Sequence, residues 1–194
     1  MSQKRIFNAA KLLFVLAFST LSFSTYAQDK YNYVYFNQMT EVSGTEYIIA
    51  SIYNMGKMFV SHDQYLLFIN TENGHTKQVT FPEGGSWHSI TQVRIDSLQI
   101  NKIILEVKTV NLDHRRGIGW ADPTQLVVLS TDGEEKVQLT EDKFFVRTWI
   151  VNRQTGTVTV TGHYDTNDNG KYDKTDKNQI LIYDLKSYKL VARI

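Results

Sequence analysis

The chain of 194 residues contains no cysteine. It therefore cannot form a disulfide, carry a thioether-linked lipid at its start, or use a thiolate to bind zinc or attack a substrate. It also lacks a Gly-x-Ser-x-Gly turn, the usual setting of a nucleophilic serine in one large class of hydrolases. Past residue 30 no stretch shows the period of an amphipathic helix. These absences exclude disulfide-rich folds, cysteine chemistry and predominantly helical folds.

The start of the chain has the three parts of a secretory signal peptide. Basic residues stand at positions 4, 5 and 11, an apolar run covers 12–18, and Thr25 and Ala27 are the small residues that precede a cleavage site. Cleavage is expected between Ala27 and Gln28. Ser19 interrupts the run before the roughly 20 apolar residues of a membrane span. An uncleaved anchor or a buried N-terminal helix are the weaker alternatives, and 1–27 is predicted to be a signal peptide.

Charge and length bound what the remaining chain, 28–194, can do. Removing 27 residues leaves 167, which is one ordinary domain with a substantial core. That domain carries 18 basic against 20 acidic residues, so nothing in its balance attracts nucleic acid or an anionic membrane. We expect an exported protein of the periplasm or medium, most readily in a bacterial envelope, with no membrane span after cleavage.

Short runs rich in Val, Ile, Thr, Tyr and Phe, separated by turn residues, predict an all-β domain. The same order of runs recurs three times, over about 31–81, 89–140 and 144–194, with Gly74 matched by Gly133 and Ser187. A second glycine precedes the third strand of each unit, as Gly56, Gly117 and Gly170. Units of this size favour three four-stranded antiparallel blade-like sheets, as a half-propeller or a compact β-meander.

The closing hairpins of two units, 65–80 and 126–140, resemble the outer hairpins of TolB-type β-propeller blades. The Trp-Ser-Pro-Asp-Gly turn typical of that family is absent, and Trp149 stands in a loosely comparable place. The resemblance implies blade-like sheets and transfers no catalytic or partner-binding residue. Closed propellers have four to eight blades. Three units therefore predict either a homodimer of six sheets or a chain curled into a barrel or sandwich.

Residues 165–176 match the spacing of a calcium-binding EF-hand loop. Oxygen-bearing side chains fall at loop positions 1, 3, 5, 9 and 12, and Gly170 at position 6 allows the sharp turn. The predicted ligands of one calcium ion are Asp165, Asn167 and Asn169 by side chain, Lys171 by its carbonyl, Asp173 directly or through water, and Asp176. Strands are expected on both sides, so this is an EF-hand-type loop without the flanking helices.

Asp176 stands where the EF-hand pattern has Glu, and its shorter side chain is expected to weaken calcium binding and to narrow the preference for calcium over magnesium. We expect a dissociation constant of about 0.1–1 mM, as in extracellular modules. The alternative is a solvated Asn/Asp/Gly turn. Aligning Gly117 or Gly56 with Gly170 places unsuitable side chains at the ligand positions, so a single site is predicted. Asp63 and Asp122 are expected to share with Asp176 a structural position before the third strand.

The five histidines are scattered and are expected at surface or turn positions. The leading hypothesis is an exported, non-catalytic, calcium-binding β-repeat protein that acts as a binding or scaffolding module for a protein or glycan partner. The alternative is a secreted hydrolase or lyase-like enzyme that uses the calcium loop or His163, which would share a strand face with Asp165 but has no evident nucleophile beside it. His114 and Trp120 lie in a basic loop, and Tyr31, Tyr33 and Tyr35 are expected to pack rather than bind sugar.

Overall fold

Three antiparallel sheets of four strands each account for the regular structure, which confirms the predicted all-β fold. The computed structural model describes residues 36, 38–51, 65–82, 85–114 and 117–194. The predicted signal peptide, the tyrosines at 31, 33 and 35, Gly56, His62, Asp63 and the arginines at 115 and 116 lie outside these residues. Within them, no helix has the length and apolar character needed to cross a membrane.

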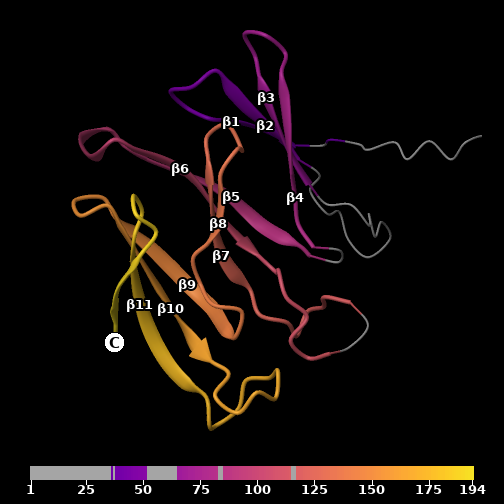
Figure 1. Ribbon diagram of the computed structural model, residues 1–194, viewed down its shortest axis with the longest axis vertical. Coiled ribbons are helices and arrows are strands. Elements are labelled where there is room, and N and C mark those ends of the chain that lie inside the picture. The colour runs from indigo at the N-terminus through magenta and orange to yellow at the C-terminus, as the bar shows by residue number, and fades with distance from the viewer. Residues whose placement is uncertain (1–35, 37, 52–64, 83–84, 115–116) are drawn as a thin grey trace, which may run out of the picture. The chain divides into compact units, whose positions relative to one another are not determined.

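Each sheet is a meander in which consecutive strands are neighbours (Figure 1). Sheet A contains β1 (Gln38–Glu41), β2 (Tyr47–Ser51), β3 (Tyr65–Asn70) and β4 (Thr76–Thr80). Sheet B contains β5 (Trp87–Ile95), β6 (Ile100–Val107), β7 (Gln125–Ser130) and β8 (Lys136–Gln138), with a single 3-10 turn, η1 (Asp96–Leu98), after β5. Sheet C contains β9 (Phe144–Asn152), β10 (Thr157–Tyr164), β11 (Lys177–Asp184) and β12 (Leu190–Arg193).

The last hairpin of every sheet has the same hydrogen bond, which fixes how the three units align. The N–H groups of Asn70, Ser130 and Asp184 each donate to the carbonyl five residues later. Gly74 and Gly133 take a positive φ in these turns, as expected of glycine. Counted from these hydrogen bonds, Gly133 matches Ser187, as predicted, but Gly74 stands one residue later and matches Tyr188, which also has a positive φ. The predicted match of Gly74 with Gly133 is thus wrong by one residue.

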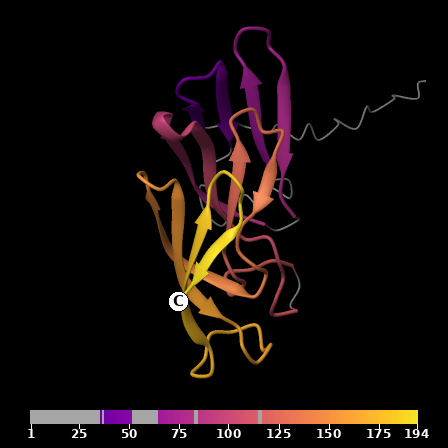
Figure 2. The same cartoon turned by 60° about the vertical axis from the view of Figure 1, so that its left-hand side comes forward.

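Sheet B is buried on both faces, because successive side chains of a strand point to opposite sides. Ile103, Leu105, Val127 and Leu129 pack with sheet A residues such as Phe68 in one apolar cluster. The alternate residues of the same strands pack with sheet C in a second cluster: Ile104, Leu126 and Val128 with Phe144, Val158, Val160, Leu181 and Tyr183. The sheets therefore stack in chain order, A on B and B on C (Figure 2). They form no closed barrel, so the barrel among the predicted alternatives was wrong.

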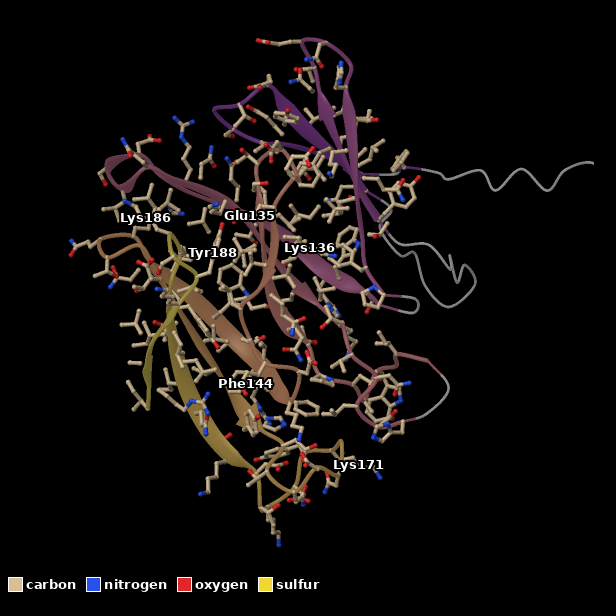
Figure 3. The ribbon with its side chains drawn as sticks, in the orientation of Figure 1. Glu135, Lys136, Phe144, Lys171, Lys186 and Tyr188 are labelled. Carbon is tan, nitrogen blue, oxygen red and sulfur yellow. The ribbon has the colours of Figure 1, made fainter. Side chains whose placement is uncertain are left out.

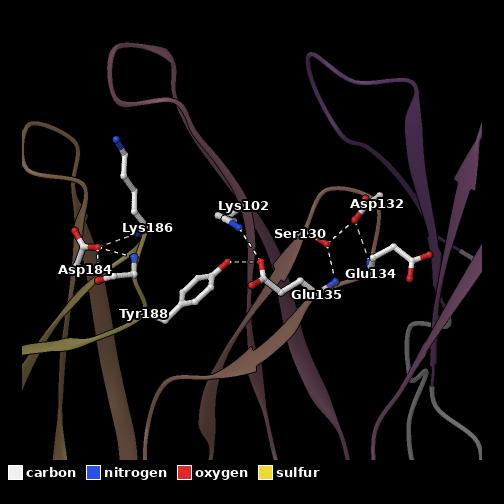
Figure 4. A network of polar contacts seen from close by, with 9 residues as sticks. Lys102, Ser130, Asp132, Glu134, Glu135, Asp184, Lys186 and Tyr188 are labelled. Atoms are coloured by element: carbon white, nitrogen blue, oxygen red, sulfur yellow. Dashed lines mark hydrogen bonds and ion pairs between the residues drawn. The ribbon is translucent and has the colours of Figure 1, made fainter.

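A polar network also joins the hairpins of sheets B and C (Figure 4). Glu135 accepts a hydrogen bond from the Tyr188 hydroxyl at 2.7 Å and pairs with the Lys102 ammonium at 3.0 Å. The same ammonium lies 5.0 Å from the centre of the Tyr188 ring. The hydrogen bonds from Tyr188 and Lys102 lower the pKa of Glu135, so it is ionised at neutral pH. On the other side of sheet B, Lys77 pairs with Glu134.

Two glycines of the closing hairpins, Gly74 and Gly133, separate turn strain from packing at the A–B junction. A Cβ on Gly133 would lie 2.7 Å from the Phe68 ring, whereas a Cβ on Gly74 would meet nothing within 4 Å. Both residues have a positive φ near +76°. We expect Gly74→Ala to lower the free energy of unfolding by about 1 kcal/mol, through backbone strain alone. Gly133→Ala should cost about 2–4 kcal/mol, because overpacking adds to the strain.

Chemical denaturation of both variants measures this difference. Equal losses in the two variants would contradict the close packing of the sheet B hairpin on Phe68.

Candidate functional site: the loop between β10 and β11

The predicted calcium loop, 165–176, connects the two central strands of sheet C, and Lys171 lies near its tip (Figure 3). Its first and last predicted ligands are both buried: Asp165 is 1% exposed and Asp176 is 8% exposed. The other predicted side-chain ligands are more accessible to solvent. The loop therefore presents polar side chains on the outside and two carboxylates at its base.

Asp165 holds the turn of the loop. Its two carboxylate oxygens accept hydrogen bonds from the backbone N–H groups of Asn169, at 3.1 Å, and Gly170, at 2.8 Å. Gly170 has a φ of +68°, and a Cβ there would lie 2.7 Å from the carbonyl oxygen of Leu112 in the neighbouring loop of sheet B. Gly170 is thus needed for its conformation, as the sequence predicted, and also for close packing between the two loops.

Asp173 gathers the two predicted asparagine ligands. One of its oxygens accepts hydrogen bonds from the side-chain amide nitrogens of Asn167, at 2.8 Å, and Asn169, at 2.6 Å. The other accepts from the hydroxyl and the backbone N–H of Thr175. These bonds, those from Thr175 first, hold the pKa of Asp173 well below its usual range, so its carboxylate is ionised. The exposed Asp168 points elsewhere and pairs with Lys143.

Asp176 clamps the two ends of the loop together. Its oxygens accept from the backbone N–H groups of Thr166, at 3.0 Å, and Asp173, at 2.8 Å. Asp122 does the same in sheet B, where it accepts from Leu112 at 2.7 Å and Gly119 at 2.6 Å. In both loops the donors lie ten and three residues before the aspartate. The predicted shared position of Asp122 and Asp176 is therefore confirmed, with Asp63 outside the described residues.

The hydrogen bonds accepted by Asp122 and Asp176 align the sheet B and sheet C loops one residue away from the alignment of Gly117 with Gly170. They place Leu112 opposite Thr166, whereas matching the glycines placed it opposite Asp165. On the corrected alignment Gly119 stands where sheet C has Asp173. The sheet B loop thus keeps the clamp but lacks the carboxylate that gathers the asparagines in sheet C.

Each loop has a lysine whose pKa is affected by a buried aspartate: Lys108 by Asp122 in sheet B, and Lys143 by Asp165 in sheet C. In sheet B the Lys108 ammonium donates hydrogen bonds to the carbonyl oxygens of Trp120, at 3.2 Å, and of Asp122. Burial lowers the pKa of Lys108, and the Asp122 carboxylate raises it by a smaller amount. Among the described residues, no ion pair involves Asp165 or Asp176. Buried carboxylates are normally paired, strongly hydrogen-bonded or bound to a metal. The sheet C loop thus holds two buried carboxylates for which the described part of the protein supplies no ion-pairing cation.

The donor set of the loop suits a hard cation, but its side chains are not gathered round a point. Across the described residues, no three His, Asp or Glu side chains are grouped closely enough to hold a metal ion. Each carboxylate keeps free lone pairs beyond the hydrogen bonds described. The amides of Asn167 and Asn169 turn their nitrogens toward Asp173, so a cation there would require both amides to rotate and present oxygen.

His163, next to this loop, is 4% exposed, so the expectation of a surface or turn histidine was wrong for this residue. Its ring stacks on Phe145 at 4.6 Å between centres and contacts Tyr172 at 4.3 Å, and the Arg147 guanidinium lies 5.2 Å from the Tyr172 ring. Neither ring nitrogen has a hydrogen-bond partner among the described residues. The other described histidines, His75, His88 and His114, are exposed.

Burial lowers the pKa of His163, against the opposing attraction of Asp176 and Asp165 and with the help of Arg147. The imidazole is therefore neutral near pH 7. A general base needs a hydrogen-bonding path to the proton that it removes. Such a path is missing here within the described residues, and the geometry gives His163 a packing role.

Sequence reasoning located the loop but missed the aromatic surroundings of His163. Phe145 reaches it from the neighbouring strand, where the two residues are paired in register, and Tyr172 reaches it from within the loop. The alternation of β9 and β10 could have suggested the Phe145 contact, since cross-strand partners share a face.

Comparisons with known proteins assign no family to the chain. No protein-family model matches it, and no curated protein matches it. Among solved structures, the acylaminoacyl peptidase of Pyrococcus horikoshii is similar, with a TM-score of 0.42 and 11% sequence identity. The match covers 82% of this chain and 24% of that one, so this chain spans about a quarter of the peptidase. A similarity of this size transfers neither fold family nor activity.

Replacing His163 tests its packing role. We expect His163→Phe to raise the free energy of unfolding by about 1 kcal/mol, because a phenyl ring keeps the stacking and removes two buried, unbonded nitrogens. The gain should grow as the pH falls below about 6.5, since the unfolded wild type then binds a proton that the buried imidazole resists.

Thermal unfolding of both proteins at pH 7.5 and pH 5.5 measures this gain. A variant that is less stable than the wild type at both pH values would show that the imidazole has a polar role.

Proposed function

We propose that this chain is an exported, non-catalytic β-repeat protein that acts as a binding or scaffolding module and holds one calcium ion in the 165–176 loop. The observation that carries the calcium proposal is the pair of buried carboxylates, Asp165 and Asp176, for which the described residues supply no ion pair. In sheet B the Asp122 carboxylate acts on the pKa of Lys108, and in sheet C Asp165 acts on that of Lys143, which forms its ion pair with Asp168 instead. A divalent cation would give Asp165 and Asp176 the direct partner that Lys143 does not.

The chemistry of the loop selects the kind of cation. Carboxylate, amide and backbone carbonyl oxygens are the ligands preferred by calcium and magnesium, and softer metals favour nitrogen or sulfur. Asp165, Asp173 and Asp176 would provide the charge, and Asn167, Asn169 and the Lys171 carbonyl would complete the shell. Asp173 accepts hydrogen bonds from both asparagine amides, so these three side chains already lie together, and both amides would have to rotate to turn their oxygens to the ion.

The proposed role of the ion is structural. It would link the end of β10, at Asp165, to the start of β11, at Asp176, and so hold a loop that packs against sheet B at Gly170. An exported protein meets the higher calcium concentrations of extracellular fluids, which suits weak binding. The resemblance of the closing hairpins to TolB-type blades supports a binding or scaffolding module, and the partner would be a protein or a glycan.

Calcium should raise the melting temperature of the wild-type protein. At about ten times the dissociation constant, the ion adds roughly 1.4 kcal/mol to the free energy of unfolding, which corresponds to a few degrees for a domain of this size. Asp173→Asn should abolish the shift, because it removes an accessible charged ligand and leaves both buried carboxylates in place.

Asp168→Asn is the matched control for this experiment. It removes the same charge from the same loop, but Asp168 pairs with Lys143 and is outside the proposed ligand set. The calcium shift should therefore persist in this variant. An unchanged melting temperature of the wild type at several millimolar calcium would contradict the site, as would a shift that survives in Asp173→Asn.

A further inference from the structure

The two end sheets each carry a face that is equivalent to a buried face of sheet B. We define the front of a sheet as the face toward the next sheet along the chain, and the back as the opposite face. The hairpin hydrogen bonds align Leu66 and Phe68 of sheet A with Leu126 and Val128 of sheet B, and all four are buried on a front face.

The corresponding residues of sheet C are Ile180 and Ile182. Ile180 is 38% exposed and Ile182 is half-buried, because sheet C is the last sheet of the chain. Their neighbours on the same face are Ile150, which is 70% exposed, Thr159 and Ala192. This face therefore combines apolar and β-branched side chains in register and has no charged residue in the row of Ile150, Thr159, Ile182 and Ala192.

The back of sheet A shows the complementary situation. Val127 and Leu129 on the back of sheet B are buried against sheet A. Their equivalents on sheet A, Leu67 and Ile69, are half-buried, and Met39, in the same row as Leu67, is 70% exposed.

The third strands of all three sheets have the sequence of two-sided burial. Residues 66–69, 126–129 and 180–183 are unbroken apolar runs, which are typical of strands covered on both faces. Among the described residues, such cover on both faces is complete at sheet B. The sequence of sheets A and C thus indicates one further neighbour each.

We infer that a second copy of this chain supplies both neighbours, with the front of sheet C packed on the back of the partner's sheet A. The occupant follows from continuity with the two interfaces inside the chain, which are both front-to-back contacts between successive sheets. A two-fold axis makes the contact twice and leaves no end sheet uncovered. The resulting six sheets fall within the range of closed propellers. This dimer does not depend on the calcium proposal.

Light scattering and sedimentation of the purified protein at micromolar concentration test the inference, with a mass of two chains expected. Ile150→Glu and Met39→Lys should each raise the dissociation constant of the dimer by roughly tenfold or more, since each buries an unpaired charge at both contacts. Both side chains are 70% exposed within one chain, so the fold should survive, which circular dichroism checks.

Mixing the two variants gives the sharpest result. In the mixed dimer one contact is wild type and the other carries both opposite charges, so dimer should be recovered. Trp120→Glu is the control, because Trp120 is 88% exposed, lies between β6 and β7 of sheet B and belongs to neither end sheet, so its replacement should leave the dimer intact.

Three outcomes would overturn the inference. The first is a wild-type monomer at tens of micromolar, which would leave these faces to a different protein. The second is a series of growing polymers, which would exclude two-fold closure. The third is a dimer that Ile150→Glu disrupts but Met39→Lys does not, with no recovery on mixing, which would indicate front-to-front pairing of two C sheets.

Discussion

Burial of sheet B on both faces is the constraint on which the other features of the domain depend. Each side chain of a strand points to one face of the sheet, and successive side chains point to opposite faces. β6 and β7 therefore need apolar residues at successive positions, so that alternate ones pack against sheet A and sheet C. Ile103 and Leu105 face sheet A, whereas Ile104 faces sheet C. A shift of one residue in the register of either strand would exchange these faces. The hairpin hydrogen bonds at Asn70, Ser130 and Asp184 hold the strands of all three sheets against such a shift.

The same constraint explains which strands could be predicted from sequence. The apolar runs 66–69, 126–129 and 180–183 are typical of central strands, and they lie within β3, β7 and β11. β1, Gln38–Glu41, has no such run and is mostly exposed, so its strand conformation comes from pairing with β2. β5 begins at Trp87, before the second unit predicted to begin near residue 89, and its register shifts between Trp87 and Ile90. The pattern of apolar residues along one strand does not reveal such pairing with a neighbouring strand or such a register shift.

The loop of sheet C shows the same division. Its oxygen-bearing side chains stand at fixed spacing, so the sequence alone identifies them, and the clamp by Asp176 was foreseen from its recurrence as Asp122. The burial of His163 could not be read in this way. It depends on Phe145, Tyr172 and the covered base of the loop, which come together only when β9 and β10 are paired.

The two clamps also limit what an ion can contribute to this loop. In sheet B, Asp122 orders its loop through three backbone N–H groups, those of Leu112, Asp113 and Gly119. Asp176 and Asp165 likewise use both of their oxygens on backbone N–H groups. An ion at this site would share these oxygens with the amides, so its binding free energy would be reduced. The loop is therefore ordered by its own hydrogen bonds, and the proposed ion would add to a fold that the stacked sheets already maintain.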